Sequence, residues 1–260
     1  MRVTKNIVQC LRTLKFLIRH ITFAPYLLWF NFRHLPFKQA IKLPIFILSR
    51  NKSLKKGKVI IASEKITTGM IKIGIRSYLQ HPIGATFSNK GGTVVFEGSC
   101  FITNNSSLII SKDGYLSIGN KVGISTTEIK CASSIEINSG TMIGINCLIM
   151  DSDFHPVIDI YAQKAIKMSK PIIIGRNNWL GAGTYVLKGT QTPDNIIVGA
   201  RSVLNKKYKV PEFSIIGMKQ SAEFIDEGYC VDFNYDISQE GNRKLTQEEI
   251  EKILSRKRQK

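Results

Sequence analysis

The sequence has little of what would mark a metal site. Its five cysteines lie far apart and form no Cys-x-x-Cys pair, and it contains only four histidines. Closely spaced cysteines and histidines are the usual signature of a structural zinc site. The odd number of scattered cysteines therefore predicts reduced, mostly buried thiols in a cytoplasmic protein, and no metal site.

Long apolar runs are also missing. Residues 1–50 contain short apolar pieces, but none approaches the roughly 20 consecutive apolar residues that a membrane-spanning helix needs. No small-residue cleavage site follows a clean apolar run, so we expect no secretory signal peptide.

Acidic side chains are scarce. The chain has 19 Asp and Glu residues against 37 Lys and Arg residues, which gives a net charge of +18. Such an excess predicts an anionic partner, whether nucleic acid, an acidic lipid surface or an acidic or phosphorylated substrate. No nucleic-acid recognition motif accompanies the charge, and the basic residues concentrate in the terminal extensions. We therefore expect no nucleic-acid partner.

What the sequence does have is a six-residue repeat over residues 174–209. Its first positions are Ile174, Leu180, Val186, Thr192, Val198 and Leu204. Glycine occupies the second position in three of these six hexads, where it would supply the backbone freedom of a corner. A period of six fits neither a helix nor a long alternating strand. It fits a chain that turns every six residues and returns above itself after three turns, which predicts a parallel β-helix.

The repeat divides the chain into three parts. Residues 59–149 carry a degenerate form of it, so we expect the β-helix over residues 59–217. The segment 150–171 interrupts the repeat as an inserted loop, and a long insertion in a regular solenoid is more often functional than accidental. Residues 218–260 follow as a carboxy-terminal extension. Within it, Thr246 and Glu249 have the spacing of a capping box, which predicts a short terminal helix.

Residues 1–58 are of a different kind. Apolar residues at helical spacing from Leu11 to Ile21 are interleaved with Arg and Lys, and an aromatic stretch follows at 26–32. A basic amphipathic helix of this type can lie in the interface of an acidic membrane. Its apolar face can equally pack on the β-helix or on a neighbouring subunit, and the sequence leaves both interpretations open.

The inserted loop carries the best candidate for a general base. His155 follows Asp151 and Asp153, and a neutral imidazole can accept a proton near neutral pH. In an extended strand, Asp153 and His155 would project on one face together with Asp151. The Asp153 carboxylate could then hold the imidazole in one tautomer. The alternative is a surface histidine without a catalytic role.

These features together resemble a known family. The hexads, the sequence Asp-Phe-His-Pro at 153–156 and the sequence Ile-Gly-Arg-Asn-Asn-Trp-Leu-Gly-Ala-Gly at 174–183 are similar to those of the hexapeptide-repeat acyltransferases. The nearest branch is the sugar O-acetyltransferases similar to maltose and galactoside acetyltransferases. Residues 26–44 resemble the amino-terminal segments of bacterial enzymes of capsule and lipopolysaccharide assembly.

The resemblance implies a mainly β protein. Its fold would be a left-handed parallel β-helix with an α-helical amino-terminal extension and a short carboxy-terminal helix, usually assembled as a homotrimer. It also implies that His155 takes the proton from a sugar hydroxyl, which then attacks the thioester of acetyl-CoA. Acetyl-CoA would be a substrate, and no metal would take part.

The resemblance further implies a set of coenzyme-binding positions. Trp179 would lie near the thioester, and small side chains would let the pantetheine arm follow the coil. The remaining positions would lie near the nucleotide or supply a basic side chain: the full set is Trp179, Ala182, Ala200, Asn205, Lys206 and Lys219. The family commonly has Gly-x-Pro-Ala followed by a basic residue at this point, whereas the chain here reads Gly-Met-Lys-Gln-Ser-Ala. Lys219 is included because it would replace that basic residue.

The expected function is acetyl-CoA-dependent O-acetylation of a sugar hydroxyl in a bacterial surface-polysaccharide precursor. The acceptor would be a glycan or a lipid-linked sugar. The enzyme would be cytoplasmic, with possible peripheral attachment to the inner face of the membrane through residues 1–58. Two alternatives stay open: an N-acetyltransferase acting on an amino sugar, and a non-catalytic β-helix scaffold.

Overall fold

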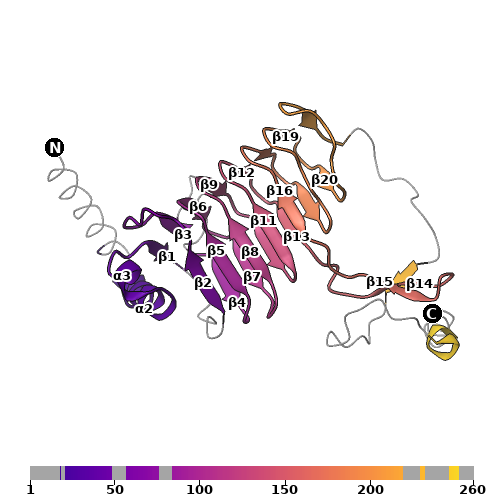
Figure 1. The fold of residues 1–260 in the computed structure, drawn as a ribbon, viewed down its shortest axis with the longest axis horizontal. Coiled ribbons are helices and arrows are strands. Elements are labelled where there is room, and N and C mark those ends of the chain that lie inside the picture. The colour runs from indigo at the N-terminus through magenta and orange to yellow at the C-terminus, as the bar shows by residue number, and fades with distance from the viewer. Residues whose placement is uncertain are drawn as a thin grey trace.

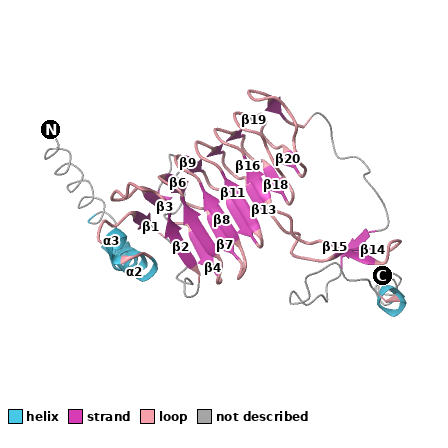
Figure 2. Ribbon diagram, viewed as in Figure 1, coloured by secondary structure: helices cyan, strands magenta, loops and turns pink. Residues whose placement is uncertain are grey.

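The computed structural model describes residue 18 and residues 21–48, 57–75, 84–218, 229–231 and 246–251. Most of these residues form a three-sided parallel β-helix, with a helical segment at its amino-terminal end (Figure 1). Short strands make the sides and tight loops make the corners (Figure 2). The predicted fold class is confirmed, and it is consistent with the left-handed β-helix that the resemblance implies.

The chain runs along side 1, side 2 and side 3 in turn before it returns one layer further on. Side 1 stacks β1 (Ile45–Ile47), β3 (Ile71–Ile75), β6 (Cys100–Thr103), β9 (Val122–Ile124), β12 (Met142–Ile143), β17 (Trp179–Leu180), β19 (Ile197–Val198) and β21 (Ile215–Ile216). Side 2 stacks β4 (Thr86–Asn89), β7 (Ser107–Ile110), β10 (Glu128–Cys131), β13 (Leu148–Met150), β18 (Tyr185–Leu187) and β20 (Val203–Leu204). Side 3 stacks β2 (Lys58–Ile61), β5 (Thr93–Phe96), β8 (Tyr115–Ile118), β11 (Ser134–Ile137) and β16 (Ile172–Ile174).

The core is made of inward-pointing side chains that stack from coil to coil. On side 2 this column is Leu108, Ile129, Ile149, Val186 and Leu204, joined in parallel register and buried throughout. Val186 and Leu204 are three hexads apart, as the repeat predicts. Each buried aliphatic side chain of this kind contributes roughly 1.5–3 kcal/mol.

The glycines at the second hexad position allow close contact between coils. A Cβ atom added to Gly181 would lie 2.6 Å from the backbone nitrogen of Ala200, and one added to Gly175 would lie 2.2 Å from the carbonyl oxygen of Pro193. Neither residue is among those with a positive φ. The expectation that these glycines supply conformational freedom is therefore wrong for both; they leave room for the next coil.

The amino-terminal helices close one end of the coil. η1 (Ile21–Phe23), α2 (Ala24–His34) and α3 (Phe37–Ala40) precede β1. Asn31 is fully buried, and its amide donates to the carbonyl oxygen of Ile45 (2.8 Å) and accepts from the Ile45 N–H (3.1 Å). One face of α2 therefore packs on the β-helix. The amphipathic helix predicted from Leu11 to Ile21 lies almost entirely outside the described residues. The coil itself begins at β1, inside the segment 1–58 that the sequence predicts to be a helical extension.

The inserted loop is a hairpin that joins the carboxy-terminal extension. β14 (Val157–Asp159) pairs antiparallel with β15 (Lys164–Ile166) and, on its other edge, with β22 (Tyr229–Val231). The hairpin projects away from the coil in Figure 1. A short helix covers residues 247–251.

The predicted capping box is present at the start of that helix. The Thr246 N–H donates to Oε2 of Glu249 (2.9 Å), and the Glu249 N–H donates to Oγ1 of Thr246 (3.3 Å). The Gln163 side chain also donates to Oε1 of Gln247 (2.9 Å), which ties the helix to the hairpin. None of the helices in the described part of the chain combines the length and apolar character that crossing a membrane requires.

Candidate active site

The insert leaves the coil through a closed base. The Asp153 N–H donates to the carbonyl oxygen of Met168 (3.1 Å), and the Lys170 N–H donates to that of Asp151 (2.9 Å). Ser152 and Ser169 form an antiparallel bridge between these two bonds. His155 lies two residues after Asp153. It is therefore carried on a hairpin stem whose base is fixed by these backbone hydrogen bonds.

Asp151 anchors this stem to the preceding coil. Its side chain is fully buried, and its two carboxylate oxygens accept hydrogen bonds of 2.7 Å from the N–H groups of Ala132 and Ser133. Burial raises the pKa of Asp151, and these backbone N–H groups offset only part of that effect. The expectation that Asp151 shares one exposed face with His155 is wrong, because the carboxylate points into the corner between β10 and β11.

A second anchor comes from the following coil. Nζ of Lys188 forms an ion pair with Asp153 and also donates to the carbonyl oxygen of Lys167 (3.1 Å). Lys188 is not among the site residues predicted from the sequence. The feature that could have identified it is the register between β13 and β18. Leu187 pairs with Met150, and this places Lys188 above the start of the insert.

His155 is exposed at the start of the hairpin. Phe154 has a φ of 57°, and its N–H donates to Oγ of Ser152 (3.1 Å). The predicted extended strand is therefore wrong at this point, because a residue in the left-handed region turns the chain between Asp153 and His155. The catalytic roles of His155 and Asp153 stay predictions.

The expected coenzyme positions fall into two groups. In the first group Trp179 is 56% exposed on side 1, in register with Met142 and Ile197. Ala182 and Ala200 are exposed at stacked corners between sides 1 and 2, one coil apart. Their small side chains leave the outer surface of this corner open.

The second group lies at the next corner, between sides 2 and 3. Asn205 and Lys206 are exposed there, directly after β20. Because Val186 pairs with Leu204, Lys206 stands one coil above Lys188 and thus above the base of the insert. Nζ of Lys206 lies 5.7 Å from the centroid of the Tyr208 ring. Lys219 lies outside the described residues.

The outer face of side 2 separates the two groups. Tyr185 and Val203 are in register on this face, 47% and 41% exposed. A single ligand that contacts both groups within one chain must therefore cross these two side chains. This face is the surface that joins the Ala182 corner to the corner of the insert.

The described cysteines do not offer a nucleophile. Cys100, Cys131 and Cys147 are buried, unbridged thiols. Burial raises the pKa of Cys100 to about 12 and also raises those of the other two. A protonated, buried thiol is a poor nucleophile. Within the described residues, no cluster of three or more His, Cys, Asp or Glu side chains is placed to hold a metal ion.

No family model matches the chain. It is 29% identical over 135 residues to a galactoside O-acetyltransferase of Lactococcus lactis subsp. lactis (strain IL1403), a match that covers 52% of this chain and 54% of the relative. It is 31% identical over 93 residues to a polysialic acid O-acetyltransferase of Escherichia coli O1:K1 / APEC, which covers 36% of this chain and 28% of the relative.

The chain thus spans about half and about a quarter of the lengths of these two curated relatives. Among solved structures, the crystal structure of the polySia-specific acetyltransferase NeuO matches 68% of this chain and 70% of that chain, at 21% identity and a TM-score of 0.38. The two sequence matches support the resemblance of this chain to the hexapeptide-repeat sugar O-acetyltransferases.

Proposed function

We propose that this chain is an O-acetyltransferase that transfers the acetyl group of acetyl-CoA to a sugar hydroxyl of a bacterial surface polysaccharide. One observation carries the proposal: an exposed imidazole stands on a hairpin whose base is fixed by Asp151 below and Lys188 above. The names of the two sequence relatives, both sugar O-acetyltransferases, support the reaction class. The polysialic acid relative favours a polysaccharide acceptor.

In the proposed reaction His155 acts as general base. It accepts the proton of the acceptor hydroxyl while that oxygen forms a bond to the thioester carbonyl carbon. Backbone N–H groups would stabilise the resulting oxyanion. As the C–S bond breaks, the imidazolium returns its proton to the departing thiolate, so the products are the acetylated sugar and free CoA. Asp153, already held by Lys188, would orient the imidazole.

The proposed donor site uses both groups of coenzyme-binding residues. Trp179 would pack on the pantetheine arm, and Ala182 and Ala200 would leave room for it at the corner. The arm would then cross side 2 over Tyr185, so that the thioester reaches the insert. Lys206 and Lys219 would contact phosphate oxygens of the nucleotide.

A homotrimer is part of this proposal, because side 1 presents an apolar ladder. Its exposed members, in register from coil to coil, are Phe101, Met142, Trp179, Ile197 and Ile215, with Gly123 between the first two. A contiguous exposed apolar face of this kind marks an interaction surface. A second copy of the chain would cover it, which would place Trp179 where two subunits meet.

Peripheral membrane attachment is the second structural part of the proposal. Leu28, Trp29 and Phe32 are exposed on α2, on the side away from the residues that pack on the coil, and Phe32 contacts Phe37 at a centroid distance of 6.2 Å. Exposed basic residues of the same segment, such as Lys38, lie close by. An apolar face flanked by positive charge suits the surface of an acidic membrane. The cytoplasmic face of the inner membrane would be its location.

The test is the chemistry of the product. The purified chain is incubated with labelled acetyl-CoA and either a galactoside or polysialic acid, and the labelled glycan is then treated with mild alkali. An O-acetyl ester releases its label under these conditions, whereas an N-acetyl amide retains it. Alkali-stable label would identify the N-acetyltransferase alternative. A folded chain that binds no acetyl-CoA and transfers no label would be a scaffold.

A further inference from the structure

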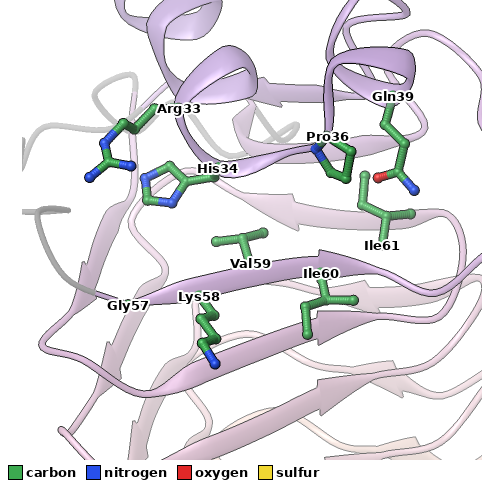
Figure 3. A pocket seen from close by; sticks show the side chains of 9 residues that line it. All are labelled: Arg33, His34, Pro36, Gln39, Gly57, Lys58, Val59, Ile60 and Ile61. Atoms are coloured by element: carbon green, nitrogen blue, oxygen red, sulfur yellow. The ribbon is translucent and has the colours of Figure 1, made fainter.

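A hollow lies at the opposite end of the molecule from the insert. It has a volume of about 470 Å³ and lies between the junction of α2 with α3 and the first strand of side 3, β2 (Figure 3). Ligand pockets in proteins commonly have volumes of about 300–1,000 Å³, so the hollow is within the range of a small-molecule site. Four strand spacings along side 3 separate β2 from β16, where the insert ends, a distance of about 19 Å along the axis.

One end of the hollow is positively charged. Arg33, His34 and Lys58 line this end, and in Figure 3 they lie on the same side of the cavity. The ring of His34 packs against Phe30 at a centroid distance of 4.7 Å, which fixes its place. Neither Arg33 nor Lys58 forms an ion pair with another described residue, since the two ion pairs found there involve other lysines. None of the nine described residues that line the hollow is acidic.

The other end is neutral. Gln39 lies there, with Pro36 and Ile61 beside it in Figure 3. Oε1 of Gln39 is buried and accepts no hydrogen bond from the described residues. A buried acceptor without a donor is costly, so a ligand hydroxyl or N–H at this point would bind with a net gain.

The floor of the hollow adds backbone groups. Among the described strands, β2 is the edge of side 3 and pairs with β5 alone. The Lys58 N–H donates to Gly92 and the Ala62 N–H donates to Phe96, so alternate residues of β2 face β5. The N–H and C=O groups of Val59 and Ile61 consequently face the open edge, toward the hollow.

We propose that this hollow binds an acidic sugar unit, one that carries a carboxylate or a phosphate. The anionic group would lie between Arg33 and Lys58, two cations that form no ion pair with another described residue. The ring would rest on Ile60 and Pro36, and a hydroxyl would donate to Gln39. A neutral sugar would leave the charged end unused, and a simple anion would leave the amide end unused.

The hollow would therefore be a docking site for an acidic acceptor polymer, remote from the reacting unit. This role in acceptor binding rests on the proposed acetyltransferase function, whereas the binding of an acidic sugar does not. A polymer held at both places would remain bound while successive hydroxyls reach His155. Monosaccharide acceptors would gain nothing from the hollow.

The test is equilibrium binding by calorimetry with the full chain. The ligands are a sialic acid oligomer, a hexose phosphate, a neutral maltose oligomer and vesicles of anionic phospholipid. The test variant is Arg33→Gln with Lys58→Gln, and the control is Lys90→Gln with Lys112→Gln, which removes the same charge from exposed lysines elsewhere on the coil. Circular dichroism and thermal melting confirm that both variants fold. Acetyl transfer to a monosaccharide is measured alongside.

We expect both acidic ligands to bind the native chain and the control equally, and the test variant at least about tenfold more weakly. The maltose oligomer should not bind. An equal loss of affinity for the acidic ligands in the test variant and the control would overturn the proposal. It would also be overturned if neither acidic ligand bound the native chain. It would also be overturned if the test variant lost binding only to vesicles of anionic phospholipid, since the ligand would then be a lipid. Absence of any acetyl transfer would refute the proposed function and leave the binding result standing.

Discussion

Lys188 and Asp153 form an ion pair between the insert and the coil that follows it, and this contact fixes the base of the hairpin that carries His155. The two side chains are 19% and 33% exposed, so the contact is partly shielded from water. It joins the insert to the coil that follows, while Asp151 joins it to the coil before. The base of the insert is thus held by the coil before it and by the coil after it.

Removal of the lysine should loosen the insert more than it weakens the fold. For Lys188→Met we expect a loss of no more than about 1 kcal/mol in the free energy of unfolding, because partly exposed ion pairs contribute little. We expect kcat to fall about tenfold, because the imidazole loses its orientation. Hydrogen exchange over residues 151–170 should speed up. The control is Lys164→Met at the far end of the hairpin, and equal kcat values for the two variants would contradict the role of Lys188.

Asp151 provides a prediction about pH. Burial raises its pKa above the ordinary value of 3.8, so the folded chain holds this proton more tightly than the unfolded chain. The contribution of Asp151 to stability is therefore fully present below pH 3.8. It is lost as the pH rises through the pKa of Asp151 in the folded chain. In Asp151→Asn that contribution does not titrate.

The variant should be less stable at every pH, by about 1–3 kcal/mol, because an amide cannot accept from both Ala132 and Ser133. Its deficit relative to the native chain should shrink as pH rises above 3.8. Urea denaturation of both proteins at a series of pH values measures this. A deficit that grows with pH would show that the two N–H groups outweigh burial and lower the pKa.

The apolar ladder on side 1 predicts an oligomer. Met142→Asp places a charge in its centre, where the native side chain is 53% exposed in the single chain. We expect the native chain to sediment as a trimer and the variant as a monomer with unchanged circular dichroism. Tyr115→Asp, at an exposed position on side 3, is the matched control and should leave the trimer intact. A native monomer would refute the assembly.

The donor site predicts that Trp179 contributes to coenzyme binding. Trp179→Ala should weaken acetyl-CoA binding by about tenfold, the effect of losing one aromatic packing contact. Tyr185→Ala should weaken it as well if the pantetheine arm crosses side 2. Calorimetry measures both affinities, and sedimentation shows whether the trimer persists. Native affinity in both variants would place the coenzyme elsewhere.

Much of the fold could be predicted because the six-residue repeat is regular over residues 174–209. From Ile174 to Leu204 the inward first position of every hexad except that of Thr192 is aliphatic and buried. The structure stacks Leu180 on Val198 and Val186 on Leu204 in parallel register. Thr246 and Glu249 likewise form the capping box that their spacing indicates. Local patterns of this type are visible because the residues that interact are close in sequence or separated by a whole number of turns.

The rest depends on contacts that no local pattern records. Phe154 adopts a left-handed conformation that a bulky residue rarely takes, so the alternation assumed for Asp153 and His155 fails there. Strand β22 has no periodic signal, and it forms because the insert offers a free edge. Lys188 becomes visible only when the register of two coils on either side of the insert is known.

The most direct test of this account measures acetyl transfer from labelled acetyl-CoA to polysialic acid by the native chain and by His155→Ala. A general base contributes roughly 10²–10⁴-fold to the rate, so the variant should lose at least about a hundredfold in kcat. It should keep its affinity for acetyl-CoA and its thermal stability, because His155 is exposed on the hairpin. Transfer by His155→Ala at the native rate would contradict the assignment of the insert as the catalytic centre.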